Sequence, residues 1–256
     1  MLIFDQVERT FSGGVFGTHK TSAVKGVSFE IGDRQRMGLV GESGCGKSTV
    51  ARMAANLIKP TKGKITLDGK DIRKMHFSEK KAFRRNVQMI FQNPQQAFNP
   101  RMKLYETMAE PIRVHKLAKN RQEEREMILH HMETVGLTAD IFKRYPHEIS
   151  GGQAQRIAIL RILMIRPKLI IADEPTSMLD VSVQAQILNL LEEAMEETGS
   201  SMLFISHDLD VVRAMCDSIL VMKDGELCEN SDSESIFRNP KHEYTKFLVK
   251  SASEAL

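Results

Sequence analysis

Apolar and polar residues alternate along the first part of the chain. The apolar members of this alternation are Leu2, Phe4, Val7, Val27, Phe29 and Ile31. A period of two residues is typical of half-buried strands, so the pattern predicts antiparallel strands over residues 2–31 around a glycine-containing loop at Ser12 to His19. A further hairpin is predicted from Ile65 to Lys70, because Asp68 and Gly69 form a dipeptide that two-residue β-turns favour.

Farther along the chain, short apolar runs alternate with segments of helical periodicity. The apolar runs are Met37 to Val40, Leu169 to Ala172, Met202 to Ile205 and Ile219 to Met222. Helical spacing follows the first run and predicts a helix that ends before Pro60. Its apolar positions are Val50, Met53, Ala54, Leu57 and Ile58. A second helix is expected to begin at Val181, with Asp180 as its N-cap. This alternation predicts an α/β fold with a central, mostly parallel sheet flanked by helices.

A charged, helical stretch from about Pro94 to Arg144 interrupts this alternation. In its clearest helix, over residues 121–135, one face carries Met127, Ile128, His131 and Val135. The periodicity predicts a helical insert in the α/β core. The last residues, Ser233 to Leu256, are predicted to form a polar stretch followed by a short helix.

The segment from Gly41 to Thr49 matches the P-loop pattern G-x-x-x-x-G-K-[ST], between a predicted strand and a predicted helix. All of its residues are expected to contact a nucleotide: Gly41, Glu42, Ser43, Gly44, Cys45, Gly46, Lys47, Ser48 and Thr49. The glycines allow backbone N–H groups to turn toward phosphate oxygens at a helix N-terminus. Lys47 is expected to reach the terminal phosphates, and the Ser48 hydroxyl to bind Mg²⁺. The sequence therefore predicts a nucleoside triphosphate site.

Two carboxylates, Asp173 and Glu174, end the apolar strand that begins at Leu169. This is the form that a Walker B segment takes in P-loop enzymes. Asp173 is expected to bind the Mg²⁺ shell through water, and Glu174 to polarise the water that attacks the γ-phosphate. Alone, such a pair would be interpreted as an acidic turn, but the P-loop favours the catalytic interpretation.

The tetrapeptide Ser150-Gly151-Gly152-Gln153 comes directly before a helical run. Its serine hydroxyl and backbone amides are therefore placed where a helix N-terminus can hold an anion. Taken alone, Ser-Gly-Gly is an ordinary turn. In a chain that already has a P-loop, it predicts a second phosphate-binding helix end.

These three motifs, in this order, resemble the nucleotide-binding subunit of an ABC transporter, and the resemblance covers nearly the whole chain. It implies that ATP and Mg²⁺ are the cofactors. By the same resemblance, Gln92 corresponds to the Q-loop glutamine and contributes to the Mg²⁺ shell, and His207 to the switch histidine. Ser177 to Asp180 resembles the D-loop, which places Asp180 near the nucleotide.

The family resemblance also implies a domain organisation. The chain is expected to be one nucleotide-binding domain with a RecA-like core and antiparallel β subdomain over residues 1–92 and 156–232. Residues 93–155 are expected to form the helical subdomain with the signature motif, and residues 233–256 a C-terminal tail. In this family two subunits pack head to tail, so that Ser150 and Gly152 of one chain cover the ATP held by Lys47 of the other.

Adenine usually stacks on an aromatic residue upstream of the P-loop, and Phe11 is favoured here over Phe16. Three positions depart from the common family pattern, namely Ile149, Ala154 and Met178. None of these departures removes a catalytic group. We therefore expect a site that hydrolyses ATP, with Glu174, His207, Lys47 and Gln92 as its catalytic residues.

Four further segments resemble the oligopeptide, dipeptide and nickel importers. They are Phe91 to Pro94, Phe98 to Arg101, Tyr145 to Glu148, and a tail that includes Asn239-Pro240 and Tyr244 to Lys246. The resemblance implies integral-membrane permease subunits as partners, an external substrate-binding protein as an indirect one, and a place at the cytoplasmic face of the cell membrane. It favours a heterodimer with a second ABC ATPase over a homodimer, and peptide over nickel as cargo.

Composition, charge and motif spacing disfavour several other classes of protein. The net charge of +3 is close to balance, which argues against nucleic acid as a partner. An ABC-type ATPase of DNA maintenance is disfavoured, because about 100 residues between Lys47 and Ser150 are too few for a long coiled coil. A nonhydrolysing regulator is disfavoured by Glu174 and His207, and an exporter by the lack of a fused membrane domain. No apolar run reaches the length of a membrane span, and no signal peptide is visible.

The three cysteines have no paired or metal-ligand spacing, which fits a reducing compartment. Only Cys216 and Cys228 lie in the C-terminal third, too few for the four thiolates of an iron–sulfur cluster, so we expect none. Cys45 is interpreted as a tolerated small residue whose thiol makes ATP binding sensitive to alkylation.

Overall fold

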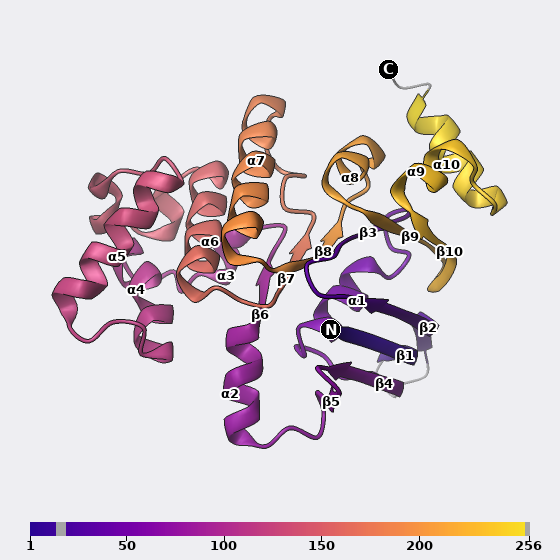
Figure 1. Cartoon of the computed structure of the whole chain (residues 1–256), viewed down its shortest axis with the longest axis horizontal. Coiled ribbons are helices and arrows are strands. Elements are labelled where there is room, and N and C mark those ends of the chain that lie inside the picture. Colours follow the sequence, from indigo (N-terminus) through magenta and orange to yellow (C-terminus); the bar gives the residue numbers. More distant parts are fainter. Residues whose placement is uncertain (14–18, 254–256) are drawn as a thin grey trace. The chain divides into compact units, whose positions relative to one another are not determined.

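The computed structural model of the chain describes residues 1–13 and 19–253 (Figure 1). The chain forms two compact units. Unit 1 comprises Met1–Phe83, Ile171–Asp173 and Ser201–Leu256, and unit 2 comprises Arg84–Ile170 and Glu174–Ser200. These bounds differ from the subdomain bounds predicted above, because the helices Gly151–Ile165 and Val181–Thr198 belong entirely to unit 2. The C-terminal tail belongs to unit 1.

An antiparallel sheet forms one part of unit 1. Its strands are β1 (Leu2–Gly13), β2 (His19–Ile31), β4 (Lys62–Leu67) and β5 (Lys70–Asp71), in the order β2-β1-β4-β5. Phe4 and Phe29 stack on each other with ring centroids 4.5 Å apart. The predicted hairpin is confirmed: β4 and β5 are joined by Asp68 and Gly69, which both have positive φ as a two-residue turn requires.

The second sheet of unit 1 supports the P-loop. Its strands are β3 (Arg36–Val40), β8 (Ser201–Ile205), β9 (Ser218–Lys223), β10 (Glu226–Asp232) and the end of β7 (Leu169–Asp173). Their order is β10-β9-β3-β8-β7, with β3 parallel to both β8 and β9, as predicted. Every residue of β7 and β8 is buried, which is typical of strands with both faces covered.

Five helices begin among the described residues of unit 1. They are α1 (Lys47–Ala54), α2 (Phe77–Asn86), α8 (Leu209–Met215), α9 (Ser233–Arg238) and α10 (Glu243–Ser253). The helix α1 is shorter than its periodicity predicted. Asn56 takes a left-handed φ of 54°, and the amides of Leu57 and Ile58 both donate to the carbonyl of Arg52. Leu57 and Ile58 therefore lie in a turn rather than on the helix.

Unit 2 is mostly helical. It contains β6 (Val87–Ile90), α3 (Pro94–Ala97), α4 (Leu104–His115), α5 (Arg121–Thr134), α6 (Gly151–Ile165) and α7 (Val181–Thr198), with short 3₁₀ turns at Ala139–Lys143 and Pro146–Glu148. Within this unit β6 neighbours the start of β7, and α6 packs against α4, α5 and α7. Of the predicted face of α5, Ile128 and His131 are buried, Met127 is half-buried, and Val135 is buried directly after the end of the helix.

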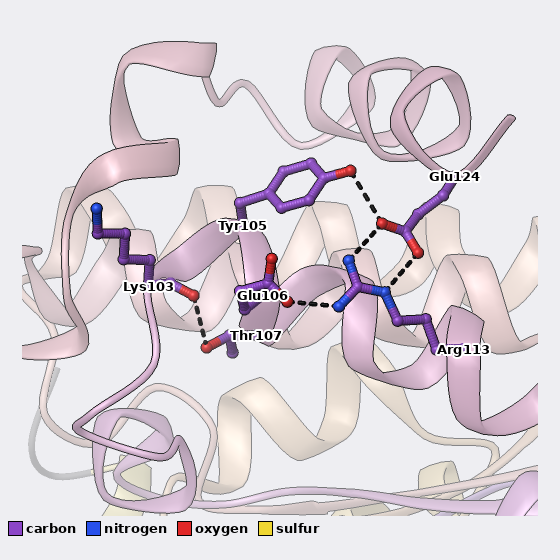
Figure 2. Close-up of polar contacts among 6 residues, drawn as sticks. All are labelled: Lys103, Tyr105, Glu106, Thr107, Arg113 and Glu124. Carbon is purple, nitrogen blue, oxygen red and sulfur yellow. Dashed lines mark hydrogen bonds and ion pairs between the residues drawn. The ribbon is translucent and has the colours of Figure 1, made fainter. Parts of the chain in front are cut away.

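A polar network joins α4 to α5 inside unit 2 (Figure 2). Arg113 donates from Nε and Nη2 to the two carboxylate oxygens of Glu124, each at 2.7 Å. The hydroxyl of Tyr105 donates to the same carboxylate at 2.9 Å, and Arg113 also pairs with Glu106. Hydrogen bonding from Arg113 holds the pKa of Glu124 below its ordinary value, although burial acts in the opposite direction. The two helices are therefore tied by a buried charge.

Candidate functional site

The backbone of the P-loop is shaped by glycines that lie in close contact with neighbouring strands. Gly41, Gly44 and Gly46 all have positive φ, at 152°, 82° and 113°. A Cβ at Gly41 would lie 2.1 Å from the carbonyl oxygen of Met222, and one at Gly46 would lie 2.3 Å from that of Ala23. No side chain fits at either position, so the loop can only form with glycine there.

The side chain of Lys47 is folded back along this loop. It is 4% exposed, and its Nζ donates to the carbonyl oxygens of Gly41 at 2.6 Å and Glu42 at 2.8 Å. Gly46 has no side chain with which to cap α1, and the amides of Thr49 and Val50 donate to its carbonyl, so the helix directs the amides that precede them toward an anion. The loop, the lysine and the helix end together form a cradle whose chemistry suits phosphate.

The first residue after Lys47 contacts the end of strand β7. The Ser48 hydroxyl donates to Asp173 Oδ1 at 3.0 Å, and Asp173 is 6% exposed. A hydroxyl and a carboxylate side by side are oxygen ligands of the kind that Mg²⁺ prefers, in sites that it completes with water and phosphate. These two oxygen ligands thus fit Mg²⁺. The hydrogen bond between them connects the P-loop to the Walker B segment, which the sequence showed only as separate motifs.

His207 follows β8 within the same unit. The strands β3 and β8 run parallel with Leu39 paired to Ile205, so the P-loop and the segment of His207 leave the sheet at the same edge. His207 is exposed. The next residue, Asp208, caps α8 by accepting from the amides of Asp210 and Val211, which fixes the backbone on the far side of the histidine.

Within unit 2, Gln92 binds the side chain of Glu174. Its Nε2 donates to Glu174 Oε2 at 2.9 Å and to Ser177 Oγ at 3.2 Å, and the Ser177 hydroxyl donates to the Glu174 carbonyl at 3.2 Å. Glu174 has a left-handed φ of 47°, which is uncommon for a residue other than glycine. The sequence suggested separate roles for Gln92 and Glu174 but no contact, and it gave Ser177 no role beyond membership in the D-loop.

The signature tetrapeptide begins α6. Ser150 is the N-cap: its Oγ accepts from the Gln153 amide at 3.2 Å, and Gln153 Oε1 accepts from the Ser150 amide at 3.1 Å. This reciprocal pair is a capping box. A Cβ at Gly152 would lie 2.9 Å from Val183 Cγ1, and one at Gly151 would lie 3.3 Å from Leu179 Cδ2. Both glycines thus allow α6 to approach α7 and the segment before it.

Three predicted residues remain to be placed, namely Asp180, Phe11 and Cys45 of the P-loop. Asp180 caps α7 by accepting from the Val183 amide at 3.0 Å, as predicted. Phe11 is 38% exposed, and the guanidinium of Arg9 lies 4.5 Å from the centre of its ring. The alternative adenine-stacking residue, Phe16, lies outside the described residues. Burial raises the pKa of the Cys45 thiol, so little thiolate is present at neutral pH.

In the described part of the chain, residues 1–13 and 19–253, no helix is both long and apolar enough to cross a bilayer. The three cysteines are free thiols, and the described residues hold no group of three or more histidine, cysteine or acidic side chains placed to bind a metal ion. A Mg²⁺ site of the kind described above needs only one carboxylate, because phosphates and water supply the other ligands.

Comparisons with known proteins agree with this geometry. Residues 24–177 match the family model described as ABC transporter. The chain is similar to the putative oligopeptide transport ATP-binding protein YkfD of Bacillus subtilis (strain 168), with 45% identity over 98% of this chain and 76% of that protein. It is also similar to the di/tripeptide transport ATP-binding protein DppF of Pseudomonas aeruginosa (strain UCBPP-PA14), with 43% identity over 96% of this chain and 76% of that protein.

Solved structures give the same fold. The dimeric structure of a post-hydrolysis state of the ATP-binding cassette MJ0796 bound to ADP and Pi aligns with a TM-score of 0.81 and 29% identity, over 91% of this chain and 99% of that one. The cbiO1 protein of Clostridium perfringens, part of the ABC transporter complex cbiONQ, aligns with a TM-score of 0.76 and 25% identity, over 100% and 95% of the two chains. The predicted P-loop fold of the ABC type is confirmed, and the chain belongs to the ABC transporter family as an ATPase of the ABC type.

Proposed function

We propose that this chain binds Mg-ATP at its P-loop and hydrolyses it to drive the import of peptides through a membrane permease. The observation that carries the proposal is the hydrogen bond between Ser48 and Asp173, 3.0 Å long, beside the enclosed ammonium of Lys47. It joins the residues that would hold the metal ion to the loop that would hold the phosphates. The names of the relatives supply the cargo, and the resemblance of four segments to importers supplies the direction.

Nucleotide binding follows from the cradle. Backbone amides of the P-loop would surround the β- and γ-phosphates, and Lys47 would neutralise their charge. Ser48 and Asp173 would hold Mg²⁺, Asp173 through water, with Gln92 as a further oxygen donor. The metal ion supplies charge neutralisation between the phosphates. Phe11 would stack on the adenine ring, and the guanidinium of Arg9 would lie close to the same stack.

Hydrolysis would depend on Glu174, whose carboxylate would orient and polarise the attacking water. The amide of Gln92 holds that carboxylate at 2.9 Å. This hydrogen bond would orient the carboxylate toward the attacking water. His207 would contact the γ-phosphate from the end of β8 and stabilise the charge that develops there.

The second half of the site would come from a partner chain. Ser150, Gly151, Gly152 and Gln153 begin α6, and a helix N-terminus that presents a hydroxyl and amides suits a γ-phosphate. In a head-to-tail dimer this end would cover the ATP of the other subunit, with Asp180 of the D-loop beside it. The structural relative MJ0796 is described as dimeric. A heterodimer with a second ABC ATPase is favoured here over a homodimer.

The proposed cargo rests on the names of the relatives. YkfD and DppF are named as oligopeptide and di/tripeptide transport ATP-binding proteins. By this likeness the chain would dock on integral-membrane permease subunits at the cytoplasmic face of the cell membrane, as a peripheral protein. An external binding protein would deliver the peptide and interact with this chain only indirectly. Nickel is the alternative cargo.

The proposal is tested by measuring Mg-ATP hydrolysis by the purified chain, alone and mixed with candidate partner ATPases. Glu174→Gln keeps the shape of the side chain but removes the base, so we expect ATP to bind while turnover falls by at least about a hundredfold. The matched control is Glu106→Gln, the same change at a half-exposed carboxylate on α4. Turnover that survives Glu174→Gln, or a wild-type chain that binds ATP but hydrolyses it in no pairing, would contradict the proposal.

A further inference from the structure

The C-terminal helix α10 contacts the P-loop through one side chain. The hydroxyl oxygen of Tyr244 accepts a hydrogen bond from the backbone N–H of Glu42 at 3.0 Å, although the two residues are 202 positions apart. Tyr244 is 6% exposed, and burial raises its pKa. The phenol therefore stays protonated at neutral pH and keeps both its acceptor and its donor.

The N–H that Tyr244 binds belongs to the peptide group that holds the P-loop lysine. The carbonyl of Gly41 and the amide of Glu42 form one peptide group, and the oxygen of this group accepts from Lys47 Nζ at 2.6 Å. A hydrogen bond to the N–H of a peptide polarises its carbonyl and strengthens it as an acceptor. Tyr244 is thus one peptide group away from the ammonium of Lys47.

The loop backbone engages two of the three donors of this ammonium. An ammonium has three N–H groups. Two of them are engaged by the carbonyls of Gly41 and Glu42, and Cys45 Sγ lies at 4.0 Å, a weak contact. A rotation of the Gly41–Glu42 peptide would move the Gly41 carbonyl, the acceptor of the shorter hydrogen bond, and would turn the ammonium. The orientation of this peptide therefore sets where Lys47 can meet a phosphate.

The position of Tyr244 is itself fixed from several sides. The ammonium of Lys223, the last residue of β9, lies 4.8 Å from the centre of the tyrosine ring. The carboxylate of Glu229 in β10 accepts from the amides of Lys241 and His242, each at 3.0 Å, just before α10 begins. His242 Nδ1 in turn accepts from the Tyr244 amide at 3.1 Å. The ring and the backbone of Tyr244 are therefore positioned by β9 and β10, which belong to the sheet that also carries the P-loop.

We infer that Tyr244 is a positioning residue of the nucleotide site, whose hydroxyl holds the Gly41–Glu42 peptide group in the orientation that aims Lys47 at the phosphates of ATP. The inference rests on the proposed ATP-binding function. The hydrogen bond from Glu42 to Tyr244 orders the P-loop before ATP binds. ATP binding then costs less conformational entropy, so the affinity for ATP is higher. Tyr244 does not touch the reacting atoms and leaves the chemical step unchanged.

The test compares Tyr244→Phe, which removes only the hydroxyl, with the wild-type chain. The Kd for Mg-ATP and the KM should rise about two- to tenfold, the range expected for one neutral hydrogen bond, while kcat at saturating ATP stays within about twofold. The exchange rate of the Glu42 amide with solvent should also increase. Glu229→Gln, which weakens the anchor before α10, should raise the Kd in the same direction by a smaller factor.

Tyr105→Phe is the matched control, because it removes a hydroxyl hydrogen bond of 2.9 Å to Glu124 in unit 2. It should leave the Kd for ATP unchanged. A purely structural role of Tyr244 would lower the thermal midpoint and kcat with an unchanged Kd, and this result would overturn the inference, as would an unchanged Glu42 exchange rate. If the wild-type chain fails to bind ATP, both the proposed function and the positioning role of Tyr244 are refuted. If the wild-type chain binds ATP and the Kd is unaltered in both Tyr244→Phe and Glu229→Gln, only the positioning role is refuted.

Discussion

The ion pair between Arg113 and Glu124 provides a quantitative test of how unit 2 is held together (Figure 2). The perturbation is Arg113→Met, which preserves much of the length and apolar surface of the side chain but removes the guanidinium. Glu124 then keeps only the hydroxyl of Tyr105 as a partner among the contacts drawn in Figure 2. Its side chain is 5% exposed, so water cannot replace the missing charge.

The expected loss follows from the burial of each partner. Removing one member of a buried pair destabilises a protein by about 3–5 kcal/mol, because the remaining charge is buried without compensation. The side chain of Arg113 is 40% exposed, however, and solvent screens a pair at its exposed end. We therefore expect Arg113→Met to reduce the free energy of unfolding by about 2–3 kcal/mol at pH 7.

Urea unfolding at pH 7 measures this loss, with Glu106→Gln as the comparison. Glu106 is the half-exposed partner of the same arginine, so its loss should reduce the free energy of unfolding by less than about 1 kcal/mol. The native pKa of Glu124 is depressed, so its stabilisation is present above its ordinary pKa and is lost as the pH falls through the native value. The difference between the wild type and Arg113→Met should shrink on acidification. Equal effects of Arg113→Met and Glu106→Gln would refute the reasoning.

Two further predictions concern the P-loop. Gly41→Ala places a Cβ 2.1 Å from the carbonyl oxygen of Met222, so it should abolish ATP binding or reduce the free energy of unfolding by about 3 kcal/mol or more; a variant with wild-type unfolding and affinity would show that the loop has room. Burial raises the pKa of both Cys45 and Cys228, but Cys45 is only 7% exposed whereas Cys228 is half-buried, so iodoacetamide at pH 7 should label Cys45 more slowly than Cys228 when the two peptides are followed by mass spectrometry. Faster labelling of Cys45 would contradict this order.

Local sequence predicted most of the α/β core but missed elements without an apolar pattern. The strands β3, β7, β8 and β9 are apolar runs and were predicted within a residue or two. The helix α2 was missed because Phe83 is its one buried residue and most of the others are polar or charged. The edge strand β10 was missed because its residues, Glu226–Asp232, are mostly polar and, among the strands that the structure describes, it pairs with β9 alone.

Element ends depend on backbone conformations that periodicity does not report. The helical spacing continues through Leu57 and Ile58, but Asn56 takes a left-handed conformation and α1 ends at Ala54. Asparagine tolerates this conformation better than most residues. The spacing alone therefore could not show that the last two apolar positions belong to a turn, where Leu57 is 57% exposed.

The candidate site was predictable where its chemistry lies in contiguous motifs. The P-loop, the carboxylates after β7 and the capping serine of α6 are all local patterns. The contact of Gln92 with Glu174 joins residues 82 positions apart, and that of Tyr244 with Glu42 joins residues 202 positions apart. Neither pair has a spacing that suggests contact, so these contacts could be found only from the structure.

The glycines illustrate what a motif leaves undetermined. In the P-loop, Gly41 and Gly46 are required because their backbones have positive φ and lie against the carbonyl oxygens of Met222 and Ala23. In the signature, Gly152 has another reason, since a Cβ there would meet the side chain of Val183 on α7. Backbone oxygens cannot move aside, whereas a valine side chain can shift a few tenths of an ångström. A glycine in a motif therefore predicts that another group lies close to its backbone. Whether a larger residue is tolerated there depends on whether that group is a backbone oxygen or a side chain that can shift.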